Sequence, residues 1–374
     1  MQPEEAFDIA VVGLSARALV TAARRAGLRA LALDLFADAD TERLAAGSVR
    51  LASGRGLTIA ADDLFAQLDR HIGPNTPVVL SSGFEHRPRL VERLTGRFPL
   101  MGSDARTLRR LKQPRALAGL LGELGIPHPR LFEEEAPPGV PALAKRIGGA
   151  GGQHIRPARR VRGRKRYLQE RLEGRAVSAL FLGDGRSARL IGFSEQWCDP
   201  APHAPFRYGG AAGPIRLDAA MEHAIADAIG RLTRATGLVG LASADLMVNG
   251  ANWHLIEVNP RPGASLDVFD HPPLPPLLRL HLDACAGRLP PELDIAPSPR
   301  AAGLLYAPAA FTLGDVPLPE WVADRPRPGT PFAPGDPVCT VLADGESAAQ
   351  ARAAVHERAH RLIGQLVPAD GTAA

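Results

Sequence analysis

The chain has 374 residues, of which 45% are hydrophobic and 22% charged, and it carries a net charge of +4 with a pI of about 9.3. This composition suffices for a buried core and for two or three domains of roughly 100–200 residues each. No stretch approaches the ~20 apolar residues that a membrane-spanning helix needs, so we expect no membrane association. Residues 1–8 are polar and acidic, unlike a secretory signal, and a cytoplasmic protein is therefore expected.

The basic and sulfur-bearing residues do not indicate nucleic-acid or metal binding. Basic residues are spread along the chain except for one run at 159–166, and aromatic residues, on which bases would stack, make up only 5%. We expect this run to be a solvated turn between two strands, with an anion contact near a nucleotide as the alternative, and we expect no nucleic-acid partner. The three cysteines, Cys198, Cys285 and Cys339, lack metal or redox spacing.

The N-terminal part predicts a parallel α/β unit. Residues 8–13 and 28–33 are short apolar runs, and residues 15–26 between them carry apolar side chains at helical spacing. A strand–helix–strand unit favours a parallel sheet, to which a further apolar run at 77–80 adds a strand. Ligands bind beyond the carboxyl ends of such strands, so the loops that follow the first and last of these runs are candidates for substrate contacts.

A dinucleotide site in this unit is disfavoured. Gly13 follows the first strand, and Asp34 lies about 20 positions further on, as NAD binding requires. The loop reads Gly-Leu-Ser-Ala-Arg-Ala rather than GxGxxG, however, and a lone glycine after a strand is weak evidence.

The rest of the chain alternates helices and strands. Ser103 and Asp104 can cap a helix that ends at a Gly-Ile-Pro-His-Pro turn, and Asn249-Gly250 marks a hairpin. In chain order we expect a helix at 105–123, a strand, glycine loop and strand at 141–155, strands within 166–182 and 188–194, a helix at 219–236 ended by Gly237, a hairpin of 238–248 with 252–258, and a helix at 347–366.

A lysine beside a glycine-rich turn, at 144–155, is the first feature that indicates chemistry. Only three of the 44 basic residues are lysines, Lys112, Lys145 and Lys165, so a lysine is more informative here than an arginine. Glycines let backbone N–H groups approach phosphate oxygens, and the ammonium of Lys145 adds a point charge. Such a turn is about as often merely flexible, but the adjacent lysine favours phosphate binding.

The segment at 167–174, Tyr-Leu-Gln-Glu-Arg-Leu-Glu-Gly, leads from a strand into a turn. It could present backbone groups to a purine and a carboxylate to a ribose. Taken alone, the pattern fits an edge strand with a solvated face better.

The predicted hairpin carries the strongest signal. Asp245 lies on its first strand, and Glu257 and Asn259 are two positions apart on its second strand, so these two share a face that Asp245 can reach across the hairpin. Carboxylate and amide oxygens are the ligands that Mg²⁺ prefers. Carboxylates flanked by apolar residues are costly to bury without a cation, and acidic strand ends would be the alternative explanation.

The order of these features resembles the ATP-grasp superfamily over residues 8–295, and the segment at 256–263, Ile-Glu-Val-Asn-Pro-Arg-Pro-Gly, is the most specific match. The resemblance implies an α/β ATP-grasp fold. It implies a βαβ parallel-sheet N-terminal domain at 1–101, a two-part nucleotide-binding domain of mainly antiparallel sheets at 102–295, and a C-terminal segment similar to that of biotin carboxylases at 296–374.

Roles follow from the resemblance by position. It implies that the protein binds ATP and Mg²⁺, with Mn²⁺ as an alternative metal. The residues implied in ATP binding are Lys112, Lys145, Gly149, Gly151, Gly152, Glu170, Leu172 and Glu173. The implied metal ligands are Asp245, Glu257 and Asn259, and the implied catalytic residues are Lys145 and Arg261, the latter beside an acyl phosphate. Arg146 and His154 depart from the family pattern and leave the geometry of the glycine loop open.

The resemblance implies an ADP-forming ligase that activates a carboxylate as an acyl phosphate for attack by an amine, in coenzyme or amino-acid biosynthesis. A bicarbonate-activating carboligase and an ATP-binding regulator without catalysis are the alternatives. The chain has no MKM-like biotin attachment site, which favours the amide ligase, and the complete Asp–Glu–Asn set disfavours the regulator. We expect small-molecule carboxylate and amine substrates, and a homodimer is compatible. Candidates for the acceptor site are Arg17, Glu85 and the segments 195–197 and 206–210.

Overall fold

The N-terminal part forms the predicted parallel sheet. The computed structural model describes residues 7–54, 57–293 and 297–367, and its first four strands pair in the order β3-β2-β1-β4. They are β1 Ile9–Val12, β2 Ala30–Asp34, β3 Gly47–Arg50 and β4 Val78–Leu80. The helices among them are α1 Arg17–Arg25, α2 Ala39–Leu44, α3 Ala61–His71 and α4 Pro88–Thr95. Strands β1, β2 and β4 are buried throughout, as expected for a parallel sheet covered on both faces.

The carboxylate of Asp34, at the end of β2, is hydrogen-bonded to backbone N–H groups. It accepts N–H hydrogen bonds from Ala16 at 2.8 Å, Ala37 at 2.7 Å and Phe36 at 3.2 Å. The carboxylate therefore fixes the loops after β1 and β2, which agrees with the sequence evidence against a dinucleotide site.

The helix predicted at 105–123 is wrong in one respect, because it is two helices, α5 Ala105–Lys112 and α6 Pro114–Glu123. Pro114 disfavours a helical conformation for the residue before it, and Gln113 is extended at φ −93° and ψ 114°. Asp104 caps α5 as predicted, accepting the N–H of Thr107 at 2.8 Å. The break makes Lys112 the last residue of α5, and α5 packs against the later strand β13, Asn252–Asn259.

A small antiparallel sheet follows, in the order β5-β8-β6-β7. Its strands are β5 Leu131–Phe132, β6 Ala142–Arg146, β7 Arg156–Pro157 and β8 Arg166–Glu170. We call this the small sheet, and we call residues 147–155, between β6 and β7, the glycine loop. The basic run at 159–166 connects β7 to β8, and two of its arginines, Arg159 and Arg160, pair with Glu135 at the surface.

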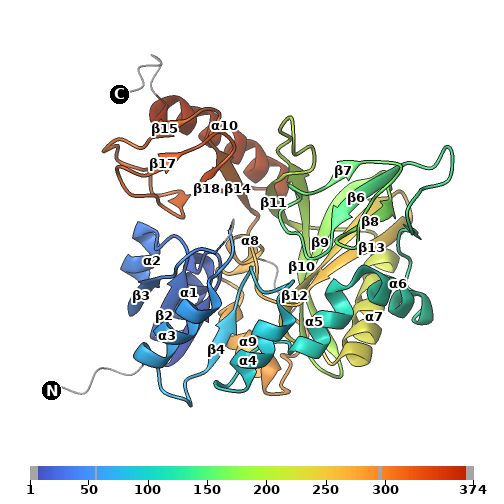
Figure 1. Cartoon of the computed structure of the whole chain (residues 1–374), viewed down its shortest axis with the longest axis horizontal. Helices are drawn as coiled ribbons and strands as arrows, with labels where there is room; N and C mark the ends of the chain where they lie inside the picture. The colour runs from blue at the N-terminus through green and yellow to red at the C-terminus, as the bar shows by residue number, and fades with distance from the viewer. Residues whose placement is uncertain (1–6, 55–56, 294–296, 368–374) are drawn as a thin grey trace.

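The remaining strands form a large antiparallel sheet in the order β13-β12-β9-β10-β11-β14-β18-β16 (Figure 1). They are β9 Arg175–Asp184, β10 Ala188–Cys198, β11 Tyr208–Ile215, β12 Val239–Asn249, β13 Asn252–Asn259, β14 Arg300–Tyr306, β16 Val322–Ala323 and β18 Pro337–Asp344, while β15 Phe311–Thr312 pairs separately with β17 Pro331–Phe332. Three strands beyond residue 296, β14, β18 and β16, therefore extend the same sheet. These sheets confirm the predicted fold class, whereas the three domain boundaries stay predictions.

Helix α7, Ala219–Thr236, covers one face of the large sheet. Its side chains, including Ile225 and Leu232, join a buried cluster with Phe181 of β9 and Leu246 of β12. The helix ends as predicted at Gly237, whose φ of 70° is a left-handed conformation that glycine adopts without strain. The opposite face of β12 and β13 is left to face the small sheet.

Helices α8 Leu266–Phe269, α9 Leu277–Cys285 and α10 Ala348–Leu366 complete the chain. Helix α1 packs against α8 and α9, and α10 packs against β14 and β18 (Figure 1). Ser347 caps α10 by accepting the N–H of Gln350 at 3.2 Å. No described helix combines the length and apolarity that crossing a membrane requires. The three cysteines are unpaired.

Candidate functional site

The predicted metal ligands lie together on strands β12 and β13. Asp245 and Glu257 are directly opposite one another across the pair, and the register shifts immediately beyond them. This β-bulge lets Leu255 and Val258 both face the core although they are three positions apart, while Glu257 and Asn259 face the other way. Two carboxylates placed directly opposite each other repel, so the pair requires nearby positive charge.

Lys112 supplies part of that charge from the end of α5. Its Nζ donates to Asn259 Oδ1 at 2.9 Å and to the Val258 carbonyl at 3.2 Å, and it lies 3.5 Å from Glu257 Oε2. The Asn259 side chain in turn donates to Asp245 Oδ2 at 3.1 Å. One lysine thus ties the end of a helix to the polar face of two strands. This contact depends on the helix break at Gln113, because a continuous helix would leave Lys112 within its interior.

Lys145 supplies further positive charge from the small sheet. Burial lowers the pKa of its ammonium, while Glu257 and Asp245 oppose that shift. Lys145 is only 8% exposed, and its Nζ has no hydrogen-bond partner within the described part of the chain. An ammonium without a hydrogen-bond partner among the described residues, on a largely buried side chain, is suited to an anionic ligand, which would supply those hydrogen bonds.

The pKa values of the two carboxylates shift in opposite directions. Burial and the charge of Glu257 raise the pKa of Asp245 to about 7. Burial would also raise the pKa of Glu257, but Lys112 and Lys145 hold it at about 2. Asp245 Oδ1 accepts hydrogen bonds from Ser178 Oγ at 2.9 Å and Gln196 Nε2 at 3.2 Å. A divalent cation would compensate this pair of acids.

The site fits Mg²⁺ better than a metal held entirely by protein. Among the described residues, no group of three or more His, Cys, Asp or Glu side chains is placed to hold an ion. Asp245 and Glu257 supply two carboxylates, and Asn259 adds an amide oxygen. Mg²⁺ usually takes one or two carboxylates and completes its shell with water and phosphate oxygens, so this donor set suits it.

The glycine loop lies against other parts of the chain at close range. Gly148 and Gly152 have φ of 69°, and Gly151 has φ of 65°, which other residues rarely adopt. A Cβ on Gly149 would lie 2.5 Å from the His154 ring, and one on Gly152 would lie 1.8 Å from the Phe206 carbonyl oxygen. The glycines therefore permit close approach of the loop to the rest of the chain.

The segment at 170–174 connects the small sheet to β9. Glu170 accepts a bidentate ion pair from Arg130 at 2.9 Å for each oxygen, and these hydrogen bonds lower its pKa. The N–H of Leu172 has no hydrogen-bond partner in the described structure, and Glu173 is exposed. A free backbone N–H at this connection suits a purine edge, whereas the Glu170 carboxylate is already engaged.

Arg261 is held by the N-terminal unit. Its Nε donates to Glu85 Oε1 at 2.6 Å, and Glu85 Oε2 accepts the N–H of Gly83 at 2.8 Å. Burial would raise the pKa of Glu85, but Arg261 and Lys112 hold it at about 2. Glu85, one of the predicted acceptor candidates, therefore orients Arg261 and belongs to the same electrostatic group as Lys112.

The acceptor candidate Arg17 holds the chain together instead of lining an open site. Its guanidinium forms a bidentate pair with Asp267 and donates to Asp324 at 3.1 and 2.9 Å. Its side chain is 5% exposed. Arg17 thus joins α1 to α8 and to the C-terminal segment. We call these three residues the Arg17 clamp.

The acceptor candidates at 195–197 also make structural contacts. Glu195 pairs with Arg352 of α10 at 2.9 Å, and the Trp197 ring packs against Arg352 and His356. Gln196, between them, contacts Asp245 and so belongs to the site. Ser178, on the neighbouring strand β9, also contacts Asp245, and the sequence analysis missed it.

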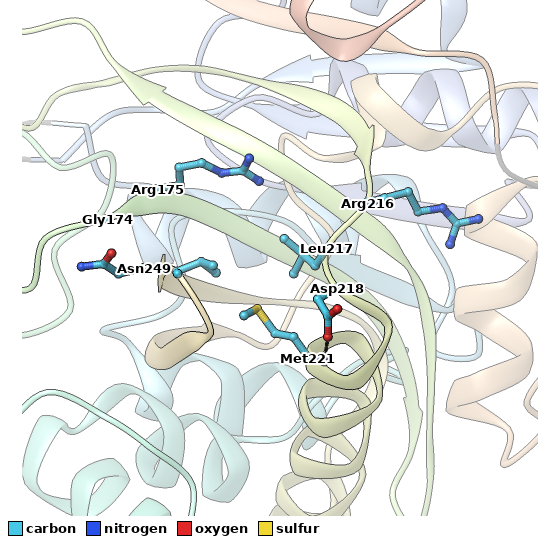
Figure 2. Close-up of a pocket in the computed structure, with 9 residues that line it drawn as sticks. Gly174, Arg175, Arg216, Leu217, Asp218, Met221 and Asn249 are labelled. Atoms are coloured by element: carbon cyan, nitrogen blue, oxygen red, sulfur yellow. Dashed lines mark hydrogen bonds between the residues drawn. The ribbon is translucent and has the colours of Figure 1, made fainter.

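A separate hollow of about 440 Å³ lies at the far end of the large sheet (Figure 2). It is formed around the start of α7 and the turn between β12 and β13, and Arg175 and Arg216 lie at its edge. None of the predicted site residues lines it. Val248, which does line it, points to the α7 face of β12, opposite the face that carries Asp245.

Residues 115–265 match the sequence family described as the ATP-grasp domain. The chain contains an ATP-grasp domain over these residues. The matched ATP-grasp region contains every predicted ATP, metal and catalytic residue except Lys112, which lies just before it. No curated protein matches the chain significantly.

Solved structures share this ATP-grasp fold at low sequence identity. Biotin carboxylase from Campylobacter jejuni is 13% identical with a TM-score of 0.69, covering 92% of this chain and 89% of that chain. N5-carboxyaminoimidazole ribonucleotide synthetase from Thermus thermophilus is 18% identical with a TM-score of 0.66, over 98% and 100%. L-amino acid ligase from Bacillus licheniformis is 15% identical with a TM-score of 0.66, over 93% and 96%. These likenesses confirm the fold.

Proposed function

We propose that this ATP-grasp protein is a Mg-ATP-dependent, ADP-forming ligase that activates a carboxylate as an acyl phosphate for attack by an amine. The observation that carries the proposal is the convergence of two lysines, two carboxylates and one amide between the small and large sheets. Lys112 and Lys145 are two of only three lysines in the chain. A bound Mg²⁺ would neutralise phosphate charge, and Asp245, Glu257 and Asn259 would hold it.

Different residues of the chain would bind the phosphates, the adenine and the ribose of ATP. Lys145, which is buried without a hydrogen-bond partner among the described residues, would contact phosphate oxygens, as would Lys112 after exchanging part of its bond to Asn259. Gly149, Gly151 and Gly152 would cover the phosphates. The Leu172 N–H would meet the adenine, and Glu173, which is exposed, would lie near the ribose. Mn²⁺ is expected to replace Mg²⁺ in part.

The reaction would proceed in two displacements. A carboxylate oxygen of the first substrate attacks the γ-phosphorus, the bond to the leaving oxygen of ADP breaks, and an acyl phosphate forms. The amine nitrogen then attacks the carbonyl carbon, phosphate leaves, and the nitrogen loses a proton. Arg261, fixed by Glu85, would orient the anionic acyl phosphate. Closure of the glycine loop would exclude water, which hydrolyses acyl phosphates.

Similar folds support both this reaction and one alternative. The proteins of similar fold from Bacillus licheniformis and Thermus thermophilus are named as a ligase and a synthetase, in keeping with a bond-forming reaction here. Biotin carboxylases have comparable fold similarity, so a bicarbonate-activating carboligase is the second candidate. The acids and lysines of the site suit either reaction, because both pass through a phosphorylated carboxylate.

The test is a screen of carboxylate and amine pairs for ADP release in carbonate-free buffer, preceded by thermal unfolding with and without Mg-ATP. Mg-ATP should raise the unfolding temperature, since a ligand that binds only the folded chain stabilises it. ADP release that needs both an acid and an amine supports the ligase, and a strict bicarbonate requirement replaces it with the carboligase. Binding of Mg-ATP without ADP release from any pair would support a regulator. We further propose a cytoplasmic location and a role in biosynthesis. We also propose a homodimer, and gel filtration with light scattering tests this oligomeric state.

A further inference from the structure

The glycine loop docks on a short segment at the end of the β10–β11 connection, which includes Tyr208, the first residue of β11. The Tyr208 N–H donates to the Gly151 carbonyl at 3.0 Å, and the Phe206 carbonyl oxygen occupies the space that a Cβ on Gly152 would fill. We call residues 206–208 the ledge. The backbone of the glycine loop contacts the ledge directly. The position of the ledge therefore decides whether the loop can close against the large sheet.

The ledge is held in place by the C-terminal part of the large sheet. Tyr306, the last residue of β14, donates its hydroxyl to the Tyr208 carbonyl at 2.8 Å. The Arg207 guanidinium lies 3.7 Å from the centre of the Tyr306 ring and is only 8% exposed as a residue. Arg207 also donates to the Asp199 carbonyl at 2.9 Å and to the Asp199 carboxylate at 2.5 Å, which closes the connecting loop.

Tyr208 therefore has its backbone fixed on both sides. Its N–H bonds to the glycine loop, and its carbonyl bonds to Tyr306. Tyr208 thus connects the Tyr306 hydroxyl of β14 to the glycine loop, through its carbonyl on one side and its N–H on the other. The chain beyond residue 296, which supplies none of the predicted ATP or metal residues, reaches the nucleotide site through this contact.

We propose that Tyr306 is a positioning residue for closure of the glycine loop, acting through the Tyr208 backbone. The inference rests on the proposed function, because it assumes that this loop closes over Mg-ATP. Tyr306 touches no predicted ligand group. Its hydroxyl holds the carbonyl of the Tyr208–Gly209 peptide, and its ring holds Arg207 on the other side of Tyr208, so that the N–H of the Arg207–Tyr208 peptide points at the Gly151 carbonyl. The C-terminal segment is in this way required for tight nucleotide binding.

The experiment measures binding of Mg²⁺ with AMP-PNP to the full chain by calorimetry. Tyr306→Phe keeps the ring over Arg207 and removes only the hydroxyl, and we expect it to raise Kd about two- to tenfold, the effect of one hydrogen bond. Gly152→Ala blocks docking directly and should raise Kd at least as much. Thr330→Val is the matched control, because it removes an exposed hydroxyl that donates to the Arg327 carbonyl at 2.7 Å away from the ledge; its Kd should not change.

A double mutant separates positioning from a general structural effect. If Tyr306 acts through the loop, Tyr306→Phe adds nothing in the Gly152→Ala background, whereas independent effects would add. Hydrogen exchange of the Tyr208 amide in the nucleotide complex reports docking itself, and it should become faster in Tyr306→Phe and remain slow in Thr330→Val. Circular dichroism confirms that each variant is folded.

The outcomes distinguish this inference from the proposed function. Failure of the unmodified chain to bind Mg²⁺ with AMP-PNP overturns the proposed function and the inference with it. Normal binding by the unmodified chain, together with an unchanged Kd and unchanged Tyr208 exchange in Tyr306→Phe, overturns the inference alone. Additive effects in the double mutant also overturn it, because Tyr306 would then act elsewhere.

Discussion

The Arg17 clamp provides a prediction about stability that does not depend on the reaction. Arg17→Met removes the cation between Asp267 and Asp324 while keeping an apolar stem of similar length. The side chains of the three residues are 5%, 12% and 22% exposed, so the change leaves two largely buried carboxylates without a counterion. Breaking such a pair by removing one partner costs about 3–5 kcal/mol, and the partial exposure of Asp324 places the expected loss near the lower end, about 3 kcal/mol.

The assay is chemical denaturation followed by tryptophan fluorescence at pH 7, with Arg24→Met as the matched control. Arg24 lies on the same helix but is exposed, so its replacement should change the free energy of unfolding by less than about 0.5 kcal/mol. Arg17→Lys should lie between the two, because a lysine keeps the charge but cannot form a fork with two carboxylates. Equal stability of Arg17→Met and Arg24→Met would refute the reasoning.

The pH dependence of the difference in unfolding free energy between the unmodified protein and Arg17→Met tests whether the ion pairs cause that difference. Burial would raise the pKa of Asp324, but Arg17 lowers it below its usual value. A depressed carboxylate pKa contributes stability that is fully present above the unfolded-state value of about 4 and is lost as pH falls through the folded-state value. In Arg17→Met this contribution is absent at every pH, so the difference in unfolding free energy between the unmodified protein and Arg17→Met should stay constant down to about pH 4 and narrow as pH falls further. A difference that does not narrow there would mean that packing, not charge, explains the loss.

Three further predictions concern the site and the fold. Glu257→Gln should abolish ADP formation while circular dichroism remains unchanged, since it removes a charge but little volume; near-normal turnover would show that Glu257 does not hold the metal. Lys145→Met should weaken Mg-ATP binding at least tenfold by calorimetry, because charge-assisted bonds contribute about 1.5–3 kcal/mol, whereas Lys165→Met, at an exposed position, should not; equal effects would remove Lys145 from the phosphate site. Gly237→Ala should lower the free energy of unfolding by about 1–2 kcal/mol, owing to its φ of 70° rather than to crowding, and no loss in a denaturant titration would contradict that view.

The sequence determined those features that depend on local pattern. The strand–helix–strand unit, the helix at 219–236 with its glycine stop and the hairpin around Asn249-Gly250 all form as expected, because periodicity and turn chemistry act over a few residues. The same locality placed Glu257 and Asn259 on one face of a strand. The break at Pro114 was also visible in the sequence, and overlooking the proline produced the single continuous helix.

Only the tertiary structure decided which distant groups meet. Arg17 and Glu85 look alike in the sequence, as charged residues in loops beyond strand ends, yet one closes a buried clamp with Asp324 and the other orients Arg261. No local pattern separates these roles, because each partner is far away along the chain. The contact of Tyr306 with the Tyr208 backbone likewise exists only because β14 pairs with β11 in one continuous sheet, so the pairing of strands, rather than any motif, brings the C-terminal segment to the glycine loop.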